Sequence, residues 1–446
     1  MSKEKIAIGE EGIYDARALG TNRVLILGLQ HMFAMFGATV LVPALTGLSV
    51  STTLLFAGLG TLLFHFLAKG KVPAFLGSSF AYLAGYWAIA PNGETELLPY
   101  ACLGVACSAI LYFILAGFIK TFGVKKVMSF FPPIVTGPII IAIGLTLSSS
   151  AIANCSSNWI VALVAIVVVI ACNIWGKGMV KIVPIIIGVV ASYLVAIPFG
   201  AVNFDAVAKA DWIGLPVRLE NTVFSIFVNP DVSLIVTSII TIMPIALATM
   251  VEHIGDISAI SSTVNQNFIE EPGLHRTLLG DGLATFVASL FGGPANTTYG
   301  ENTGVLSITR VFDPLVVRIA AYFAILFSFS PKFAALVSSM PAATVGGVSL
   351  VLYGMISAVG VRNVVENQVD FTKNRNVIIA ALILVLAIGI KFSEAGAINL
   401  SIGSLTISLS GLAVGALVGI ILNAILPGKD YEFGKGKGDS SVNFKV

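Results

Sequence analysis

Long apolar segments recur along almost the whole chain, and they restrict what it can fold into. About 20 apolar residues are needed to cross the hydrocarbon core of a membrane, and fourteen segments of this kind occur. Of the 446 residues, 57% are hydrophobic and 11% are charged, against about 25% charged residues in a soluble domain. The sequence therefore predicts an all-α polytopic membrane protein. The expected spans are centred near Met35, Phe56, Tyr82, Ile110, Ile140, Ala165, Ala191, Ile240, Phe286, Val305, Phe323, Leu350, Ala381 and Leu412.

The positions of the basic residues give the expected orientation. If the N-terminus is cytoplasmic and fourteen spans alternate, 21 of the 25 Lys and Arg residues fall on the cytoplasmic side. The positive-inside rule predicts this asymmetry. We therefore expect a multi-pass protein of the plasma or inner membrane with both termini in the cytoplasm. The four outside residues are Lys209, Arg218, Lys332 and Lys391.

The two halves of the chain resemble each other. PAFLGSSFAY, which begins at Pro73, recurs as PANTTYGENT, which begins at Pro294, at an offset of 221 residues. PPIVTG at Pro132 matches PAATVG at Pro341, at an offset of 209 residues. Seven spans per half is an odd number, so the second half enters the membrane from the opposite side. We expect two inverted seven-span repeats, with short strands that interrupt spans 3 and 10 and mark a transport site.

Carboxylates lie where a membrane helix should be apolar. Glu301 stands in TYGENTGVLSITR and Glu252 in MVEHIGD, and ionisable groups at membrane depth usually mark a transport path or a proton site. An ionised carboxylate accepts hydrogen bonds from the N–H groups of a flat solute such as a nucleobase, and a protonated one also donates. Asp256 follows Glu252 by four residues, on the same helical face. Because nearby carboxylates retain a proton more readily, we expect these three residues to couple solute binding to protons. The alternative is that neighbouring helices or water satisfy them structurally.

The interrupted spans themselves predict a binding role. Irregular backbone at membrane depth is tolerated only where it is buried in protein or lines a cavity. The breaks at GSSFAY, around Ser79, and TTYGEN, around Gly300, leave half-helix N–H groups that suit a carbonyl-bearing solute. Phe80 and Tyr299 are expected to stack on a flat ring, with an ordinary core role as the equal alternative.

The remaining polar residues are expected to be structural. Asp281, in LLGDGL, is expected to cap the start of the ninth span, and the four histidines are expected to pack without a chemical role. No CxxC pair or HExxH motif occurs, so neither a zinc site nor a metalloprotease is indicated. We expect a transporter rather than an enzyme, without a metal or any cofactor except the coupling proton, and without a nucleic-acid partner.

These motifs together resemble the nucleobase–ascorbate transporter family, and within it the bacterial uracil permeases. The resemblance runs from about Gly28 to Leu426 and rests on LQHMFAMFGATVLVPAL, KVPAFLGSSFAY, VEHIG, EPGLHR and NTTYGENTGVLSITR. The last of these contains the family signature, from Glu301 and Asn302 to Thr309 and Arg310.

The resemblance implies proton-coupled import of uracil by a homodimer in the lipid membrane, in which a core domain moves against a gate domain. The substrate-binding residues that it implies are Glu252, Glu301, Phe80, Tyr299, Gly300, Ser79 and Tyr353, and the proton-coupling residues are Glu252, Asp256 and Glu301.

The resemblance also implies domain boundaries, with the core and gate domains each built from two separate stretches of the chain. The expected order is a cytoplasmic N-terminal segment (1–23), the first core stretch with spans 1–4 (24–127), the first gate stretch with spans 5–7 (128–200), an external connector (201–231), the second core stretch with spans 8–11 (232–335), the second gate stretch with spans 12–14 (336–426) and a cytoplasmic tail (427–446).

Two positions leave the substrate open. Asp256 stands where uracil permeases often carry histidine and resembles the purine members of the family, whereas purine members usually carry glutamine at the position of Glu301. Uracil is therefore expected, and xanthine, urate or dual uracil–xanthine transport is the alternative. Anion exchangers resemble this architecture too, but an anion site requires a cation or bare helix N-termini at the breaks, which the carboxylates oppose.

Overall fold

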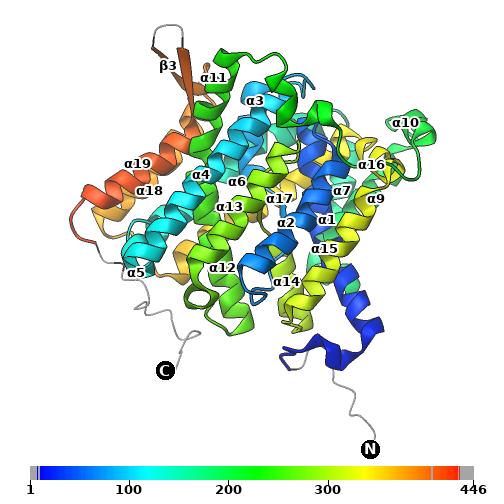
Figure 1. The fold of residues 1–446 in the computed structure, drawn as a ribbon, viewed down its shortest axis with the longest axis horizontal. Coiled ribbons are helices and arrows are strands. Elements are labelled where there is room, and N and C mark those ends of the chain that lie inside the picture. Colours follow the sequence, from blue (N-terminus) through cyan, green and yellow to red (C-terminus); the bar gives the residue numbers. More distant parts are fainter. Residues whose placement is uncertain (1–7, 9–10, 403–404, 430, 432–446) are drawn as a thin grey trace, which may run out of the picture.

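The computed structural model describes residue 8, residues 11–402, residues 405–429 and residue 431 of the chain. It is mostly helical, and the long helices run between the two ends of the molecule (Figure 1). The longer helices are α1 (Thr21–Thr46), α2 (Val50–Leu67), α4 (Leu98–Phe122), α6 (Pro133–Cys155), α7 (Trp159–Trp175), α9 (Pro184–Ala196), α11 (Val232–Ile242), α12 (Ala246–Val264), α13 (Leu274–Leu290), α14 (Gly300–Thr309), α15 (Pro314–Ser328), α17 (Ala342–Glu366), α18 (Asn374–Lys391) and α19 (Gly411–Ile425).

Short helices and four strands make up the other elements of the described residues. The short α-helices are α3 (Leu83–Ile89), α5 (Val124–Met128), α8 (Met179–Ile182), α10 (Asp205–Lys209) and α16 (Pro331–Ser338). The strands are β1 (Leu76–Ser78), β2 (Asn296–Thr298), β3 (Ala397–Ile402) and β4 (Leu405–Ser410), paired antiparallel as β1 with β2 and β3 with β4.

Several helices have the length and composition of membrane spans. Within the described chain seven qualify, with α11 and α12 together as one, or eight if α15 and α16, which meet at 90°, form a single span. A helix satisfies its own backbone hydrogen bonds, which is why it crosses hydrocarbon where an open strand does not. The expectation of a mostly helical protein with several membrane spans is confirmed.

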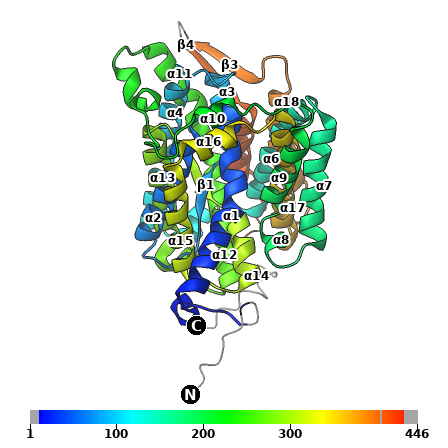
Figure 2. The ribbon, with the colours of Figure 1, turned by 90° about the vertical axis from the view of Figure 1, so that its right-hand side faces the viewer.

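The helices form two groups, which lie side by side in Figure 2. The first group contains α1, α2, α4, α11, α13 and α15; here α13 packs against both α2 and α4, and α15 packs against α1 and α2. The second group contains α6, α7, α9, α17, α18 and α19; here α17 packs against α6 and α7, and α18 packs against α6 and α19. Helix α12 lies at the boundary, because it contacts α13 and α4 on one side and α6 and α19 on the other.

Glycines allow α6 and α17 to approach closely in the middle of the second group. A Cβ atom on Gly144 would lie 2.2 Å from the carbonyl oxygen of Tyr353, and one on Gly360 would lie 2.7 Å from the carbonyl oxygen of Gly137. Near the other end of α17, a Cβ atom on Gly346 would lie 2.8 Å from the carbonyl oxygen of Ala151. No larger residue fits at these positions without separating the two helices.

The pair of strands β1 and β2 lies in the interior, with all six residues buried. The register pairs Leu76 with Thr298, and further backbone bonds join Ser79 N to Ala295 O at 2.9 Å and Tyr299 N to Phe75 O at 3.0 Å. The pairing satisfies backbone groups that would otherwise be unbonded in the interior. Two threonines attach the strands to neighbouring helices: Thr61 Oγ1 accepts from Leu76 N, and Thr285 Oγ1 accepts from Asn296 N.

We expect Gly144→Ala to destabilise the protein, because the added methyl group meets the Tyr353 carbonyl oxygen and forces α6 away from α17. Overpacking of this kind costs about 1–3 kcal/mol. The check is the thermal stability of the detergent-solubilised protein. Gly117→Ala is the matched control, because a Cβ atom on Gly117 meets nothing within 4 Å. Equal melting of the two variants would contradict the close approach of α6 and α17.

Candidate functional site

Two short helices begin directly after the central strands. β1 leads through Ser79 into the 3₁₀ turn Phe80–Tyr82 and then into α3, and β2 leads through Tyr299 into α14. Neither Ser79 nor Tyr299 caps the helix that follows it with a side-chain hydrogen bond. The first N–H groups of a helix have no partner within the helix and carry partial positive charge. The strands therefore place two sets of N–H donors in the interior of the molecule.

Open space borders the start of α14 and the facing side of α12. Cβ atoms built on Gly300 and Gly304 of α14, and on Gly255 of α12, would meet no neighbouring atom within 4 Å. These glycines contrast with the closely packed ones between α6 and α17. The two helices therefore present backbone, rather than bulky side chains, to this space.

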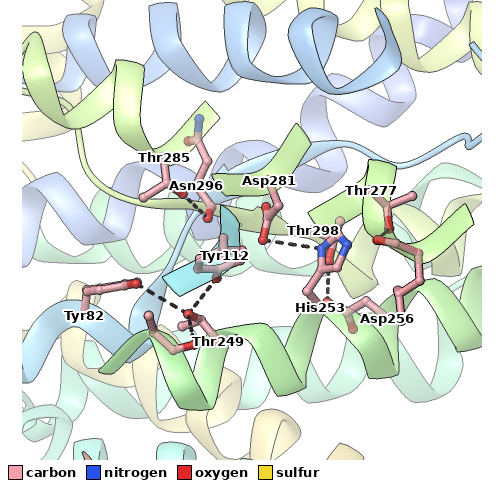
Figure 3. Close-up of polar contacts among 12 residues, drawn as sticks. Tyr82, Tyr112, Thr249, His253, Asp256, Thr277, Asp281, Thr285, Asn296 and Thr298 are labelled. Carbon is pink, nitrogen blue, oxygen red and sulfur yellow. Dashed lines mark hydrogen bonds and ion pairs between the residues drawn. The ribbon is translucent and has the colours of Figure 1, made fainter. Parts of the chain in front are cut away.

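Three carboxylates gather at this space. Glu252 and Asp256 lie one turn apart on α12, and Glu301 lies in the first turn of α14; all three are half-buried. They are near enough for Glu252 to interact electrostatically with both other carboxylates. Asp256 Oδ2 accepts a hydrogen bond of 2.8 Å from Thr298 Oγ1 and so links α12 to β2 (Figure 3). Among the described residues, no Lys, Arg or His forms an ion pair with any of the three.

The predicted aromatic residues lie in two different environments. The rings of Phe80 and Tyr353 meet edge to face, with centroids 5.8 Å apart, where the first helix group contacts α17. Tyr299 instead braces the strands: its ring lies against Gly77, and its hydroxyl donates to Ser78 O at 2.8 Å. Phe80 and Tyr353 thus meet across the boundary between the groups, whereas Tyr299 is held inside the first group.

The side chains of Ser79 and of Asn302, the neighbour of Glu301, differ in their hydrogen bonds. The Ser79 side chain is buried, and its Oγ has no hydrogen-bond partner among the described residues. Next to Glu301, Asn302 Nδ2 donates to His31 O at 3.0 Å and lies 3.1 Å from His31 Nδ1. This contact fixes the first turn of α14 against α1.

The prediction for Asp281 is wrong. The helix α13 continues through this residue, so Asp281 is not an N-terminal cap; it is fully buried, with Oδ2 3.3 Å from His253 Nδ1, and the two side chains face each other in Figure 3. The flanking glycines explain the error. Cβ atoms on Gly280 and Gly282 would lie 2.8 Å from Phe64 and 2.6 Å from Tyr112, so these glycines serve close packing rather than a helix end.

A network of hydroxyl groups lies beside this pair and was not predicted. Tyr112 donates to Thr249 Oγ1 at 2.6 Å, and the Tyr82 hydroxyl lies 3.5 Å from the same atom (Figure 3). Thr249 and His253 lie on the face of α12 that packs into the first group, next to the face that carries Glu252 and Asp256. The sequence signal was the spacing of Thr249 and His253 by four residues, which repeats the spacing of the two carboxylates.

The arrangement suits a small, flat, neutral solute. Carboxylates can accept hydrogen bonds from its N–H groups, and N–H groups at helix starts without a side-chain cap can donate to its carbonyl groups. Among the described residues, no group of three or more His, Cys, Asp or Glu side chains has the arrangement of a metal site.

We expect His253→Leu to destabilise the protein strongly, because it leaves the Asp281 carboxyl buried without its partner. Removal of one member of a buried pair costs about 3–5 kcal/mol. The double variant His253→Leu with Asp281→Leu should regain much of this loss. Thermal unfolding in detergent is the measurement. The control is Arg362→Leu, which breaks the exposed Arg362–Glu366 pair and should cost at most about 0.5 kcal/mol. A His253→Leu variant no less stable than this control would show that the buried pair contributes nothing.

Solved structures of low sequence identity share the fold. The chain matches the transmembrane domain of a cyanobacterium bicarbonate transporter, BicA, with a TM-score of 0.57 and 15% identity over 93% of this chain and 99% of that chain. It matches murine Solute Carrier 26 family member A9, an anion transporter in the inward-facing state, with a TM-score of 0.58 and 12% identity over 90% of this chain and 67% of that chain.

Sequence comparison gives a more specific relationship. Residues 22–396 match a family described as the permease family. The chain is 42% identical to the uracil permease of Bacillus caldolyticus over 91% of this chain and 92% of that protein, and 40% identical to the uracil permease of Bacillus subtilis over 96% and 97%. The uracil permease of Escherichia coli is 36% identical over 92% and 94%. The chain therefore belongs to the nucleobase–ascorbate transporter family of permeases, and it is a multi-pass membrane transporter, not an enzyme.

Proposed function

We propose that this protein imports uracil together with protons. The observation that carries the proposal is the cluster of three half-buried carboxylates beside two uncapped helix starts. Uracil has two ring N–H donors and two carbonyl acceptors, which match these two kinds of group. Relatives that share 36–42% of their residues with the chain are uracil permeases.

Each predicted site residue has a role in this proposal. Glu252 and Glu301 accept hydrogen bonds from the uracil N–H groups, and the backbone at Ser79, Phe80 and Gly300 donates to its carbonyl groups. The aromatic residues of the proposed site are Phe80, Tyr299 and Tyr353. Because the Tyr299 hydroxyl bonds to Ser78 O, the contribution of Tyr299 is to hold Gly300 and Glu301 in place, whereas Phe80 and Tyr353 cover the ring.

Protons are the proposed coupling ions, and no other cofactor is required. Carboxylates that lie close together in a site of low polarity repel one another when ionised, and proton binding relieves this repulsion. Asp256 is the proposed proton carrier, with Glu252 and Glu301 linked to it, because the hydrogen bond from Thr298 connects Asp256 to the strand that leads into α14. Binding of the base at Glu301 and binding of a proton at Asp256 thus both act on the short segment from Thr298 to Glu301.

The fourteen-span architecture also belongs to the proposal. Fourteen spans result if α15 and α16 form one span, which gives eight long apolar spans, and if α3, α7, α9, α13, α14 and α19 supply the other six. Inverted repeats are supported by Ser78 and Tyr299, which are equivalent at the offset of 221 residues and are bonded to each other. They are also supported by Gly144 and Tyr353, which are equivalent at the offset of 209 and meet where α6 crosses α17.

The two helix groups are the proposed moving bodies. The first group, with residues 24–127 and 232–335, is the core domain, and the second, with residues 128–200 and 336–426, is the gate domain. Residues 201–231 form the external connector, and residues 1–23 and 427–446 are the cytoplasmic ends. The core carries the site, and its movement against the gate opens the contact between Phe80 and Tyr353. We propose a homodimer in the cell membrane, joined through the gate.

The alternatives are separable by substrate. Xanthine or urate transport rests on Asp256 alone, and the relatives named above are uracil permeases. Anion exchange rests on the fold shared with the bicarbonate and anion transporters at 12–15% identity. Three carboxylates without a basic partner oppose an anion site.

The deciding experiment is uptake of radiolabelled uracil into proteoliposomes with an imposed inward proton gradient, with and without excess unlabelled xanthine. We expect uptake that depends on the gradient and is unaffected by xanthine. Inhibition by xanthine would move the assignment to a purine or dual-specificity permease. Absence of uracil uptake by a protein that still binds xanthine would contradict uracil transport altogether.

Glu301→Gln should lose uracil affinity by about 10- to 100-fold, because it replaces a charged acceptor at the start of α14 by a neutral amide. Equilibrium binding of uracil to the purified variant is the measurement, with thermal stability as the check on folding. Glu394→Gln, at an exposed position outside the site, is the matched control. Wild-type affinity in the Glu301→Gln variant would remove the central role of this carboxylate.

Asp256→Asn should bind uracil but fail to accumulate it above the external concentration. The amide oxygen still accepts the hydrogen bond from Thr298, but the side chain no longer carries a proton. Uptake down a uracil gradient, compared with uptake against it, is the measurement, and the exposed Asp205→Asn variant is the control. If the variant accumulates uracil as the control does, the coupling proton is carried elsewhere.

A further inference from the structure

The connecting segment between α10 and α11 exposes a row of large apolar side chains. Six residues between positions 212 and 228 have exposed fractions of 62–89%, although charged residues surround them. Large exposed apolar patches mark interaction surfaces. We name residues 212–228 the connector belt. The six residues are Trp212 (74%), Ile213 (83%), Leu215 (82%), Leu219 (77%), Phe227 (62%) and Val228 (89%).

The connector belt is held firmly against the first helix group. Val223 and Ile226 are buried beneath it, and three hydrogen bonds join the segment to α2, α4 and the end of α15. The exposed side chains therefore belong to a backbone whose inner face is already packed and bonded. The bonds are Thr52 Oγ1 to Pro216 O at 2.6 Å, Asp231 N to Tyr100 OH at 3.2 Å and Gly214 N to Phe329 O at 2.9 Å.

The belt continues the apolar outer face of the helices that it crosses. On α15 and just beyond it, Tyr322, Leu326 and Phe329 are exposed by 58%, 67% and 39%, and Gly214 of the belt bonds to Phe329. At the other end the ring of Phe224 lies edge-on to Phe291, with centroids 5.7 Å apart. Since the chain is a multi-pass membrane protein, these exposed helix faces meet lipid, and the belt extends that surface to the end of the molecule.

Charged groups lie beside the apolar row. Lys332 Nζ lies 5.0 Å from the centroid of the Trp212 ring, and Arg218 and Glu220 are exposed next to Leu219. Tryptophan together with basic residues is typical of the boundary between hydrocarbon and water. The connector crosses the end of the molecule opposite the N-terminal segment, at the top of Figure 1.

We propose that the connector belt is a lipid-binding surface that lies in the membrane interface. Trp212, Ile213 and Leu215 insert among the acyl chains of the outer leaflet, and Lys332 and Arg218 remain at the level of the headgroups. The partner is the phospholipid bilayer itself. The proposal holds whether or not the transported solute is uracil.

Fluorescence of Trp212 in proteoliposomes tests the proposal without any transport measurement. Trp87, Trp159 and Trp175 are replaced by Phe, so that Trp212 is the only tryptophan left. The quenchers are phosphatidylcholine brominated on its acyl chains, and aqueous iodide. If the triple replacement does not fold, the difference between wild type and Trp212→Phe isolates the same residue. The matched control adds Trp212→Phe and Ala208→Trp, which moves the single tryptophan to exposed α10.

We expect brominated lipid to remove most of the Trp212 emission and iodide to remove little, with the opposite pattern for the tryptophan at position 208. Quenching of Trp212 by iodide and not by brominated lipid would place the belt in water and overturn the proposal. Protection from both quenchers would also overturn it, because the belt would then be covered by protein. In that case a disulfide between Leu215→Cys subunits would identify a second copy of the chain as the cover.

Discussion

The backbone pairing of β1 and β2 is the constraint on which the rest of the structure depends. A chain that stops being helical inside a membrane protein exposes N–H and C=O groups that have no water to bond to. Here two such interruptions, 221 residues apart, pair with each other, and Thr61 and Thr285 bond to the strands from the neighbouring helices. Because the strands satisfy each other, both the 3₁₀ turn that leads into α3 and the helix α14 can start in the interior. A single interrupted helix would have no such partner.

Close helix contacts give these interruptions a rigid frame. In the first group α13 packs against both α2 and α4, with Gly280 against Phe64 and Gly282 against Tyr112. The buried Asp281 between these glycines faces His253 of α12. That contact, together with the bond from Tyr112 to Thr249, fixes the rotation of α12. The same rotation turns Glu252 and Asp256, on the neighbouring face of α12, toward the open space beside α14.

The carboxylate cluster is costly for the folded protein. Three acidic side chains without a basic partner repel one another when ionised, and either a proton or a ligand with N–H donors relieves the repulsion. A lysine nearby would relieve the same repulsion, without a bound proton or ligand. Buried His253 instead faces Asp281 one helix face away, and among the described residues it forms no ion pair with the three carboxylates.

The sequence by itself determined the helical membrane class and the family, and it singled out the two segments in which the short strands β1 and β2 lie. These depend on composition, on local pattern and on motifs that are contiguous in the chain.

Tertiary structure alone decided which polar residues meet. Gly-Asp-Gly around Asp281 resembles a helix boundary, whereas its glycines admit Phe64 and Tyr112 from other helices. Tyr299 has the sequence context of a stacking residue, and its hydroxyl is bonded to a strand 221 residues away. The charges of the connector are visible in sequence, but the burial of Val223 and Ile226 beneath it is not. The sequence could not predict these features for a physical reason. Contacts between residues distant in the chain leave no local pattern, and the free energy of a buried polar group depends on its partner.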